Sequence, residues 1–308
     1  MSPRFINKNI NKYSTAAIFL VLFMLSVAGL ARASHPPVDL GTTESFAVLA
    51  GTEITNVPTS AITGNVGLHP DTGAAITGLT CAEVIGTIYD VDGTYAGACE
   101  VTNEPLLNTA KQDLVTAYDD AASRTPVTTV LTELGGQTLT DGTYDSASTT
   151  FEITAGAGPL VLDGEGNPDA VFIFLMNSGA TGLVVGPGSE VQLTGEAQAC
   201  NVFWKLNTAT IDTTAVFKGT ILALTSITVD NGADIEGRLL ARNGNVTLIS
   251  DTITVPTCTV SSSDDTTGLP DTGLGPNDKN ALWSILLPVG IFLVGVVSLF
   301  LARSNRTV

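Results

Sequence analysis

One apolar strand pattern is repeated in Ala170-Val-Phe-Ile-Phe-Leu-Met176, Asn201-Val-Phe-Trp-Lys-Leu206, Gly219-Thr-Ile-Leu-Ala-Leu224 and Gly237-Arg-Leu-Leu-Ala-Arg242. The last three copies are separated by intervals of about one turn of a solenoid. The repeat therefore predicts a coiled stack of strands.

Two further strand-like segments, rich in Thr, Val and Ile, lie between successive copies and are bounded by Gly, Asn or Asp. The second side of the coil would collect Leu183–Val185, Ala209–Asp212, Ile227–Val229 and Val246–Ile249. The third side would collect Val191–Leu193, Ala215–Phe217 and Ala233–Glu236. Because stacked strands lie about 4.7 Å apart, a surface residue repeated once per turn forms a regular row. We expect the function on such a row.

The composition fits a folded, mostly β domain with an acidic surface. Of the 308 residues, 44% are apolar and 14% are charged, which argues against disorder. The formal net charge is −17, and all 30 acidic residues lie between terminal segments that hold six of the 13 basic residues. Such a surface repels phosphate backbones, so no nucleic-acid partner is expected. No GxxxxGK loop occurs in the sequence, so nucleotide binding has no support either.

Both ends of the chain carry targeting signals. Residues 1–33 combine early basic residues, an apolar run and Ala31-Arg32-Ala33, which is typical of a cleaved signal peptide, although an uncleaved anchor is the alternative. Residues 281–302 are long and apolar enough for a transmembrane helix, and the basic tail 303–308 would lie in the cytoplasm. We therefore expect an exported domain, 34–257, held at the cell surface by a polar linker, 258–280.

The linker contains the pentapeptide formed by Leu269, Pro270, Asp271, Thr272 and Gly273. Followed by an apolar span and a basic tail, it resembles the LPXTG cell-wall sorting signal of Gram-positive surface proteins. The resemblance implies that a sortase cuts after the threonine and joins the protein to cell-wall peptidoglycan. A plain membrane anchor is the alternative.

The four cysteines are expected to form disulfides, since export places them in an oxidising compartment. Three pairings are possible, and we favour Cys81 with Cys99, which are close in sequence, and Cys200 with Cys258. A zinc site is the rival interpretation, but the sequence has no CxxC or CxxH spacing.

One amphipathic helix is predicted over residues 104–123. Its apolar positions follow i, i+3, i+4 spacing, Asn103 is a candidate N-cap, and Pro126 limits its continuation. Its apolar stripe has to cover one stack of strands.

Longer motifs in the region 39–257 resemble the microbial ice-binding (antifreeze) protein family. They are Leu40-Gly-Thr-Thr-Glu-Ser-Phe-Ala-Val-Leu-Ala-Gly51, Ile62-Thr-Gly-Asn-Val-Gly67, Ala117-Tyr-Asp-Asp-Ala-Ala122, Glu133-Leu-Gly-Gly136, the segment 169–174, Ala199-Cys-Asn-Val-Phe-Trp204, Phe217-Lys-Gly-Thr-Ile-Leu-Ala-Leu-Thr-Ser-Ile-Thr228 and Gly237-Arg-Leu-Leu-Ala-Arg-Asn-Gly244. The resemblance implies an all-β, discontinuous right-handed β-solenoid of triangular section with one long helix alongside. It also implies that amino-terminal strands return to complete the stack.

The resemblance further implies adsorption to ice through one flat face. Relatives carry Thr-Gly or Thr-Ala, any residue, then Thr or Asn at the turn into the third strand, and that pattern is only partly present here. The predicted ice-binding residues on the third side are Thr59, Thr63, Ser189, Thr213, Val216, Asn231 and Asp234. The second side, with Thr181, Thr210, Thr228 and Thr247, is the alternative face. Its threonines could equally be β-formers on a solvated strand.

Catalysis is not expected. The only histidines are His35 and His69, so no Ser-His-Asp set is credible, and no motif singles out a pair of carboxylates.

The segment 163–169 has oxygen ligands at alternate positions, but Phe174 stands where a calcium loop needs a bidentate glutamate, so a turn is favoured. No cofactor or metal is predicted. The alternative function is a non-catalytic adhesive or structural surface domain that binds carbohydrate or cells.

Overall fold

The computed structural model describes residues 35–176 and 182–259. The chain divides into two compact units, 1–260 and 261–308, and every described residue belongs to the first. The predicted signal peptide, the sorting motif and the apolar segment 281–302 lie outside the described residues. In the described ranges, no helix is long and apolar enough to cross a membrane.

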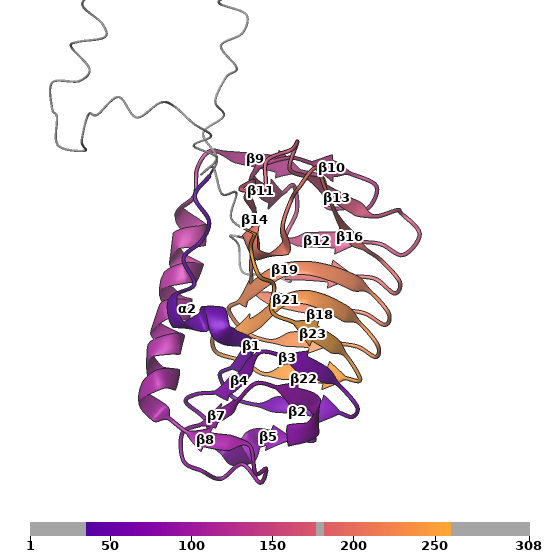
Figure 1. Cartoon of the computed structure of the whole chain (residues 1–308). Coiled ribbons are helices and arrows are strands. Elements are labelled where there is room, and N and C mark those ends of the chain that lie inside the picture. Colours follow the sequence, from indigo (N-terminus) through magenta and orange to yellow (C-terminus); the bar gives the residue numbers. More distant parts are fainter. Residues whose placement is uncertain (1–34, 177–181, 260–308) are drawn as a thin grey trace, which may run out of the picture. The chain divides into compact units, whose positions relative to one another are not determined.

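The strands form three parallel sheets, and the chain passes from one sheet to the next as it winds along the stack (Figure 1). In spatial order, the longest path of the first sheet contains β8 (Glu100–Thr102), β7 (Ile88–Asp90), β4 (Asn65–Leu68), β1 (Phe46–Ala50), β21 (Asp234–Ala241), β19 (Val216–Ala223), β17 (Val202–Leu206), β14 (Phe172–Leu175), β11 (Gly142–Ser146) and β9 (Val127–Val130). A branch from β21 contains β23 (Thr252–Thr254), β3 (Ala61–Thr63) and β6 (Val84–Ile85).

The other two sheets complete the winding. The seven-stranded sheet contains β12 (Thr150–Ile153), β15 (Gly182–Val185), β18 (Thr208–Ile211), β20 (Ile227–Val229), β22 (Val246–Ile249), β2 (Ile54–Val57) and β5 (Ile76–Thr77). The three-stranded sheet contains β10 (Thr138–Leu139), β13 (Leu160–Asp163) and β16 (Val191–Thr194). The 3₁₀ turns are η1 (Gly41–Ser45), η2 (Gly73–Ala75), η3 (Cys81–Glu83) and η4 (Ala199–Asn201).

The four repeated segments form the adjacent strands β14, β17, β19 and β21, as predicted. Their inward residues are in register, with Phe174 beside Trp204, Trp204 beside Ile221 and Ile221 beside Leu239. The rings of Phe174 and Trp204 stack at a centroid distance of 3.8 Å. These side chains are fully buried and form the centre of the core, where aromatic and aliphatic burial supplies most of the stabilisation.

The stack is discontinuous in sequence. Val48 of the early strand β1 pairs with Leu239 of the late strand β21, and β1 pairs with β4 on its other edge. In the seven-stranded sheet, β2 likewise lies between β22 and β5. The amino-terminal strands therefore extend the stack beyond the carboxyl-terminal ones, as the family resemblance implied.

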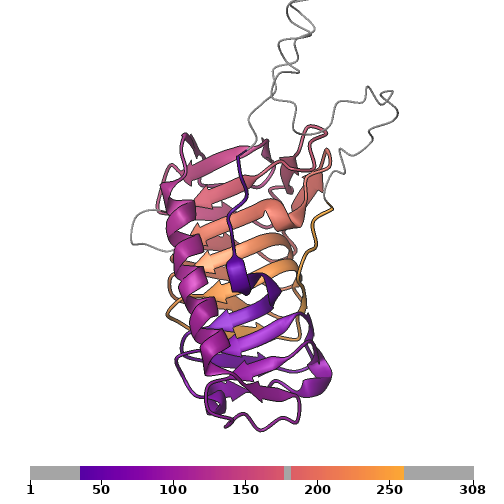
Figure 2. The same ribbon diagram turned by 60° about the vertical axis from the view of Figure 1, so that its left-hand side comes forward.

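The predicted helix is α2 (Glu104–Ser123), which lies along one side of the first sheet (Figure 2). The Asn103 side chain caps it by accepting a hydrogen bond from the Leu106 N–H at 3.1 Å. Its apolar stripe packs against outward side chains of the sheet, including Ile173, Phe203 and Leu240. The helix thus covers much of this side of the stack, which leaves the other two sides as the candidate binding surfaces.

Both favoured disulfides are present. Cys81 and Cys99 close a local loop, and Cys200 and Cys258 join η4 to the last described segment of the chain. Their Cα–Cα distances, 5.6 and 5.7 Å, are in the usual range for a disulfide.

Candidate functional site

A straight row of threonines crosses the outer surface of the seven-stranded sheet. Side chains alternate along a strand, so when Ile54 and Asn56 of β2 are buried, Thr55 points outward. The same alternation exposes one threonine on each of five adjacent strands. In register, these are Thr77, Thr55, Thr247, Thr228 and Thr210.

We call the outer surface of strands β5, β2, β22, β20, β18 and β15 the threonine face. Its strands pair without a bulge, so the five threonines follow one another at the strand spacing, over about 19 Å. Val184 continues the row with a side chain of nearly the same shape as threonine, and Glu152 of β12 ends it. The seven strands follow one another along the length of the stack, with β12 toward one end and β5 at the other (Figure 1).

The threonine row combines a methyl and a hydroxyl group at every step. Because threonine is β-branched, its χ1 angle is restricted on a strand, so these groups are held in a repeated orientation. Next to the row, Val57 and Ile249 form a short apolar pair on β2 and β22. Between Thr77 and Val184 the row carries no charged side chain.

A second surface, which we call the third face, carries charged side chains. It is formed by the first halves of β19 and β21 together with β23, β3 and β6. One of its rows contains Glu190, Val216, Asp234, Thr252 and Ala61. The next contains Lys218, Glu236, Thr254, Thr63 and Ile85. The Lys218 Nζ and Glu236 Oε2 atoms form an ion pair at 2.9 Å. Charged groups retain their own hydration, so this face is less suited to an ordered water layer.

The residues predicted for ice binding are divided between two places. Thr63, Val216 and Asp234 lie on the third face. Thr213 and Asn231 lie in stacked turns at the corner between the third and threonine faces, where Thr214 N donates to Asn231 O at 3.1 Å.

Thr59 lies in the turn between β2 and β3, at the same corner, and is exposed. The exception among the seven is Ser189. Its side chain is buried, and Ser189 Oγ donates a hydrogen bond to Ile153 O at 2.9 Å, so its expected surface position was wrong. The serine is turned inward because it satisfies a backbone acceptor of the neighbouring turn.

A buried carboxyl group supports this corner from inside. Asp251 accepts hydrogen bonds from Ala233 N at 3.1 Å and from Ile249 N at 2.7 Å. Burial raises the pKa of Asp251 to about 6, although these backbone donors oppose the shift. Its place beneath the turns gives Asp251 a structural role in holding the corner.

The segment 163–169, considered above as a calcium loop, forms a turn between strands. Asp163 Oδ1 accepts from Glu165 N at 2.8 Å, and Asn167 Oδ1 accepts from Asp169 N at 3.0 Å. No group of three or more potential metal ligands occurs in residues 35–176 and 182–259.

Sequence reasoning missed the contribution of Thr55 and Thr77 to the threonine row. Their strands precede the repeated segments in the chain and join the sheet through its discontinuity. The alternation of Ile54, Thr55 and Asn56 could have indicated that Thr55 is exposed. It could not have indicated which residues lie beside Thr55 on the adjacent strands. Thr181, which was grouped with the second side, lies outside the described residues, and Val184 occupies the matching place.

Comparison with known proteins gives consistent results. The family model described as "Ice-binding-like" matches residues 48–254. An ice-binding protein from Flavobacterium frigoris is 40% identical over 71% of this chain and 76% of its own length. One from Nostoc is 40% identical over 68% of this chain and 71% of its own length.

Solved structures agree in fold. The structure of an ice-binding protein from an Antarctic biological consortium has a TM-score of 0.64 and 38% identity, covering 75% of this chain and 96% of its own. An ice-binding protein domain from Shewanella frigidimarina has a TM-score of 0.64 and 30% identity, covering 72% of this chain and 100% of its own. The winding of parallel strands, the flanking helix and these matches show that the chain belongs to the ice-binding-like protein family.

Proposed function

We propose that this domain is a three-sided, right-handed β-solenoid that adsorbs to ice through its threonine face and needs no catalytic group. The observation that carries the proposal is the unbroken row of five threonines in register. Its relatives are named as ice-binding proteins, and the sequence motifs of that family extend over the domain.

The physical argument concerns the water next to the face. Hydroxyl groups can hold ordered waters by hydrogen bonds, and methyl groups between them favour a cage-like arrangement. Regular strand spacing repeats this arrangement along the row. A surface that already orders water in this way can join a growing crystal and restrict its further growth.

The test is ice-affinity partitioning of residues 34–260, in which a dilute solution is frozen slowly and the ice and liquid fractions are assayed. The solved Shewanella domain matches over its whole length and covers 72% of this chain, so this fragment is expected to fold alone. The variant Thr228→Tyr places a bulky side chain in the centre of the row. Thr254→Tyr is the matched control, because Thr254 is an exposed threonine on the third face.

We expect the unmodified domain and Thr254→Tyr to enter the ice, and Thr228→Tyr to remain in the liquid. Circular dichroism should show both variants folded. The reverse pattern would move the ice-binding surface to the third face. Exclusion of the unmodified domain from ice would instead favour the adhesive alternative on the same fold.

A surface location is the second part of the proposal. It is supported by the signal-peptide pattern in residues 1–33, by the disulfides, and by the motif 269–273 followed by an apolar segment and basic tail. Attached in this way, the protein would protect the cell surface from ice or hold the cell on it.

The attachment can be tested by expression in a Gram-positive host that has a sortase. The native chain should be released with cell-wall fragments after muramidase digestion. Thr272→Ala should remain in the membrane fraction. Equal release of both proteins would argue against sortase processing at Thr272.

A further inference from the structure

A cavity of about 660 Å³ lies between the segments by which the chain enters and leaves the described domain. One wall is formed by residues 37–40 with Glu44 and Ser45, and the other by residues 255–258. Phe203 and Arg238 contribute to its lining. Its volume is in the range of cavities that hold small ligands.

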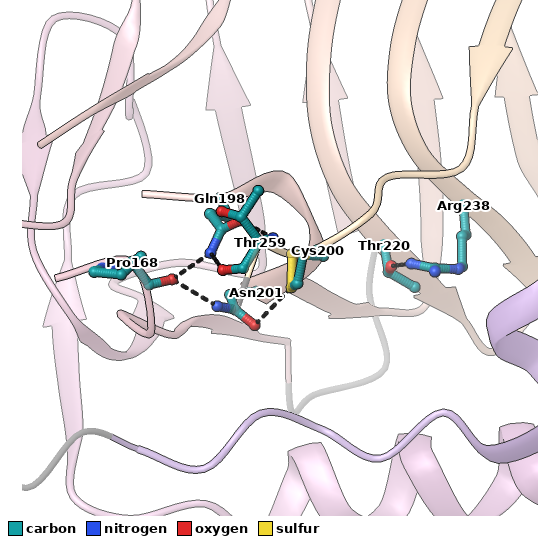
Figure 3. The surroundings of a disulfide bond; sticks show 8 residues. Pro168, Gln198, Cys200, Asn201, Thr220, Arg238 and Thr259 are labelled. Carbon is teal, nitrogen blue, oxygen red and sulfur yellow. Dashed lines mark hydrogen bonds between the residues drawn. A yellow bond between two sulfur atoms is a disulfide. The ribbon is translucent and has the colours of Figure 1, made fainter. Parts of the chain in front are cut away.

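The floor includes side chains from two strands of the first sheet, Phe203 of β17 and Arg238 of β21. Thr220 of β19, the strand between them, is in register with both and is buried. The floor therefore carries an aromatic ring and a guanidinium group, and the Thr220 hydroxyl supports the guanidinium. Figure 3 shows the Thr220 hydroxyl and the Arg238 guanidinium side by side.

Arg238 is a cation buried without a counter-ion in the described part of the chain. It is 5% exposed. Its Nε donates to the main-chain oxygen of Glu44 at 2.9 Å, and its Nη1 donates to Thr220 Oγ1 at 3.3 Å. Both acceptors are uncharged, and within the described residues no carboxylate forms an ion pair with Arg238.

The hydrogen-bonding capacity of this guanidinium is only partly used. Arginine has five N–H donors in a planar fork. The two described acceptors engage Nε and Nη1, no described acceptor is recorded for Nη2, and Arg238 lines the cavity. A fork of this kind matches the two oxygens of a carboxylate, and charge-assisted bonds of that type are strong when they are shielded from water.

The acidic groups near the cavity lie on its outer wall. The side chains of Asp39 and Glu44 are exposed, and Asp39 Oδ1 accepts the Gly41 N–H at 2.9 Å. Burial lowers the pKa of Arg238, and the charge of Glu44 opposes that shift. Because these carboxylates remain in contact with water, they leave the buried guanidinium without direct neutralisation.

Both walls are held rigidly. The Cys200–Cys258 disulfide fixes the exit segment, and Gln198 Oε1 accepts the Thr259 N–H at 2.6 Å (Figure 3). On the other side, Arg124 Nη1 of the chain after α2 donates to Pro36 O at 2.7 Å. The cavity is therefore preorganised, which lowers the entropic cost of binding a ligand.

We infer that this cavity binds a small organic carboxylate with an apolar body, its carboxylate on Arg238 and its apolar part over Phe203. This site is separate from the threonine face and does not depend on ice binding. The apolar body distinguishes the ligand from a simple inorganic anion.

Phenylacetate is a suitable probe, and phenylacetamide, which has the same shape but no charge, is its control. Binding of each to residues 34–260 can be followed by calorimetry or NMR titration. We expect saturable binding of phenylacetate and at least tenfold weaker binding of phenylacetamide. Equal binding of the two probes, or no saturable binding of phenylacetate, would overturn the inference.

Two variants locate the site. Arg238→Gln should weaken phenylacetate binding at least tenfold, whereas Lys218→Gln, which removes the same charge from the third face, should not change it. Because Arg238 also supports the Glu44 backbone, Thr257→Trp provides a second variant that fills the cavity from its exposed wall and retains the arginine. Undiminished binding by folded Thr257→Trp would place the probe elsewhere. Ice partitioning of Thr257→Trp should be unchanged, which separates this test from that of the threonine face.

Discussion

Thr55 and Thr247 lie opposite each other on the adjacent parallel strands β2 and β22, although they are at opposite ends of the domain sequence. This pairing joins the two amino-terminal threonines of the row to the three carboxyl-terminal ones. Without it, the threonine face would contain two short rows. The discontinuity of the fold thus lengthens the surface that we propose binds ice.

Replacement of Glu152 by threonine should extend the row at the β12 end. Glu152 is in register with Val184, and its charge interrupts the pattern of methyl and hydroxyl groups. We expect Glu152→Thr to increase thermal hysteresis measured at equal protein concentration. Glu190→Thr makes the same chemical change on the third face and should have little effect. A larger gain from Glu190→Thr would identify the third face as the one that meets ice.

Lys111 should give the domain a distinctive stability profile in alkaline solution. Burial lowers the pKa of Lys111 to about 7, and the nearby charge of Arg242 acts in the same direction. The lysine of the unfolded chain keeps its proton up to about pH 10.4. Between these two pKa values the unfolded state binds more protons than the folded state. As the pH rises through this range, Lys111 therefore increases the free energy of unfolding by about 1.4 kcal/mol per pH unit.

The measurement is urea denaturation between pH 7 and 9 for the native domain and Lys111→Met. The neutral amine can still donate to Ala241 O and Arg242 O, which are its acceptors in the structure. Lys111→Met should lack the rise in the free energy of unfolding between pH 7 and 9 that Lys111 contributes. Lys218→Met, which removes a lysine from a partly exposed ion pair, should retain that rise. Identical pH profiles for the native domain and Lys111→Met would show that the buried amine keeps its proton.

The two disulfides should differ in their contribution to stability. Cys200 and Cys258 are 58 residues apart in sequence, and Cys81 and Cys99 are 18 apart. Loop-closure entropy predicts a stabilisation of about 4 kcal/mol for the first bridge and about 3 kcal/mol for the second. Replacement of each cysteine pair by serine, followed by denaturant titration, measures both values. A smaller loss at the longer bridge would show that the exit segment is held mainly by its other contacts.

Trp204 should be among the most sensitive core positions. It is fully buried and stacked on Phe174, and its Nε1 donates to Lys218 O at 3.1 Å. Trp204→Ala would leave a large cavity and an unpaired carbonyl, with an expected loss of about 3–5 kcal/mol in the free energy of unfolding. Val184→Ala on the surface should cost far less. A loss below about 1 kcal/mol for Trp204→Ala would mean that the neighbouring rings repack.

Local structure was largely predictable. The helix bounds, its Asn103 cap and its buried stripe followed from spacing, and the four repeated strands followed from their shared apolar pattern. The two disulfide pairings were also predicted, because sequence proximity favoured one of them and the other followed by elimination.

Which residues come together on each exposed face was less predictable. The alternation of Ile54, Thr55 and Asn56 indicates which side chain points outward, but not that Thr55 has Thr247 and Thr77 as neighbours. The buried position of Ser189 likewise depends on a backbone acceptor, Ile153 O, from another turn of the stack.

By itself the sequence therefore determined the strands, the helix and the inward or outward direction of their side chains, because propensity, capping and periodicity act over a few neighbouring residues. Only the tertiary structure decided that Thr55 completes a row with Thr247 and that Arg238 lies at a cavity between residues 37–45 and 255–258. The reason is physical, since pairing between strands distant in the chain is chosen by the packing of the whole core, and no local pattern records which strands will meet.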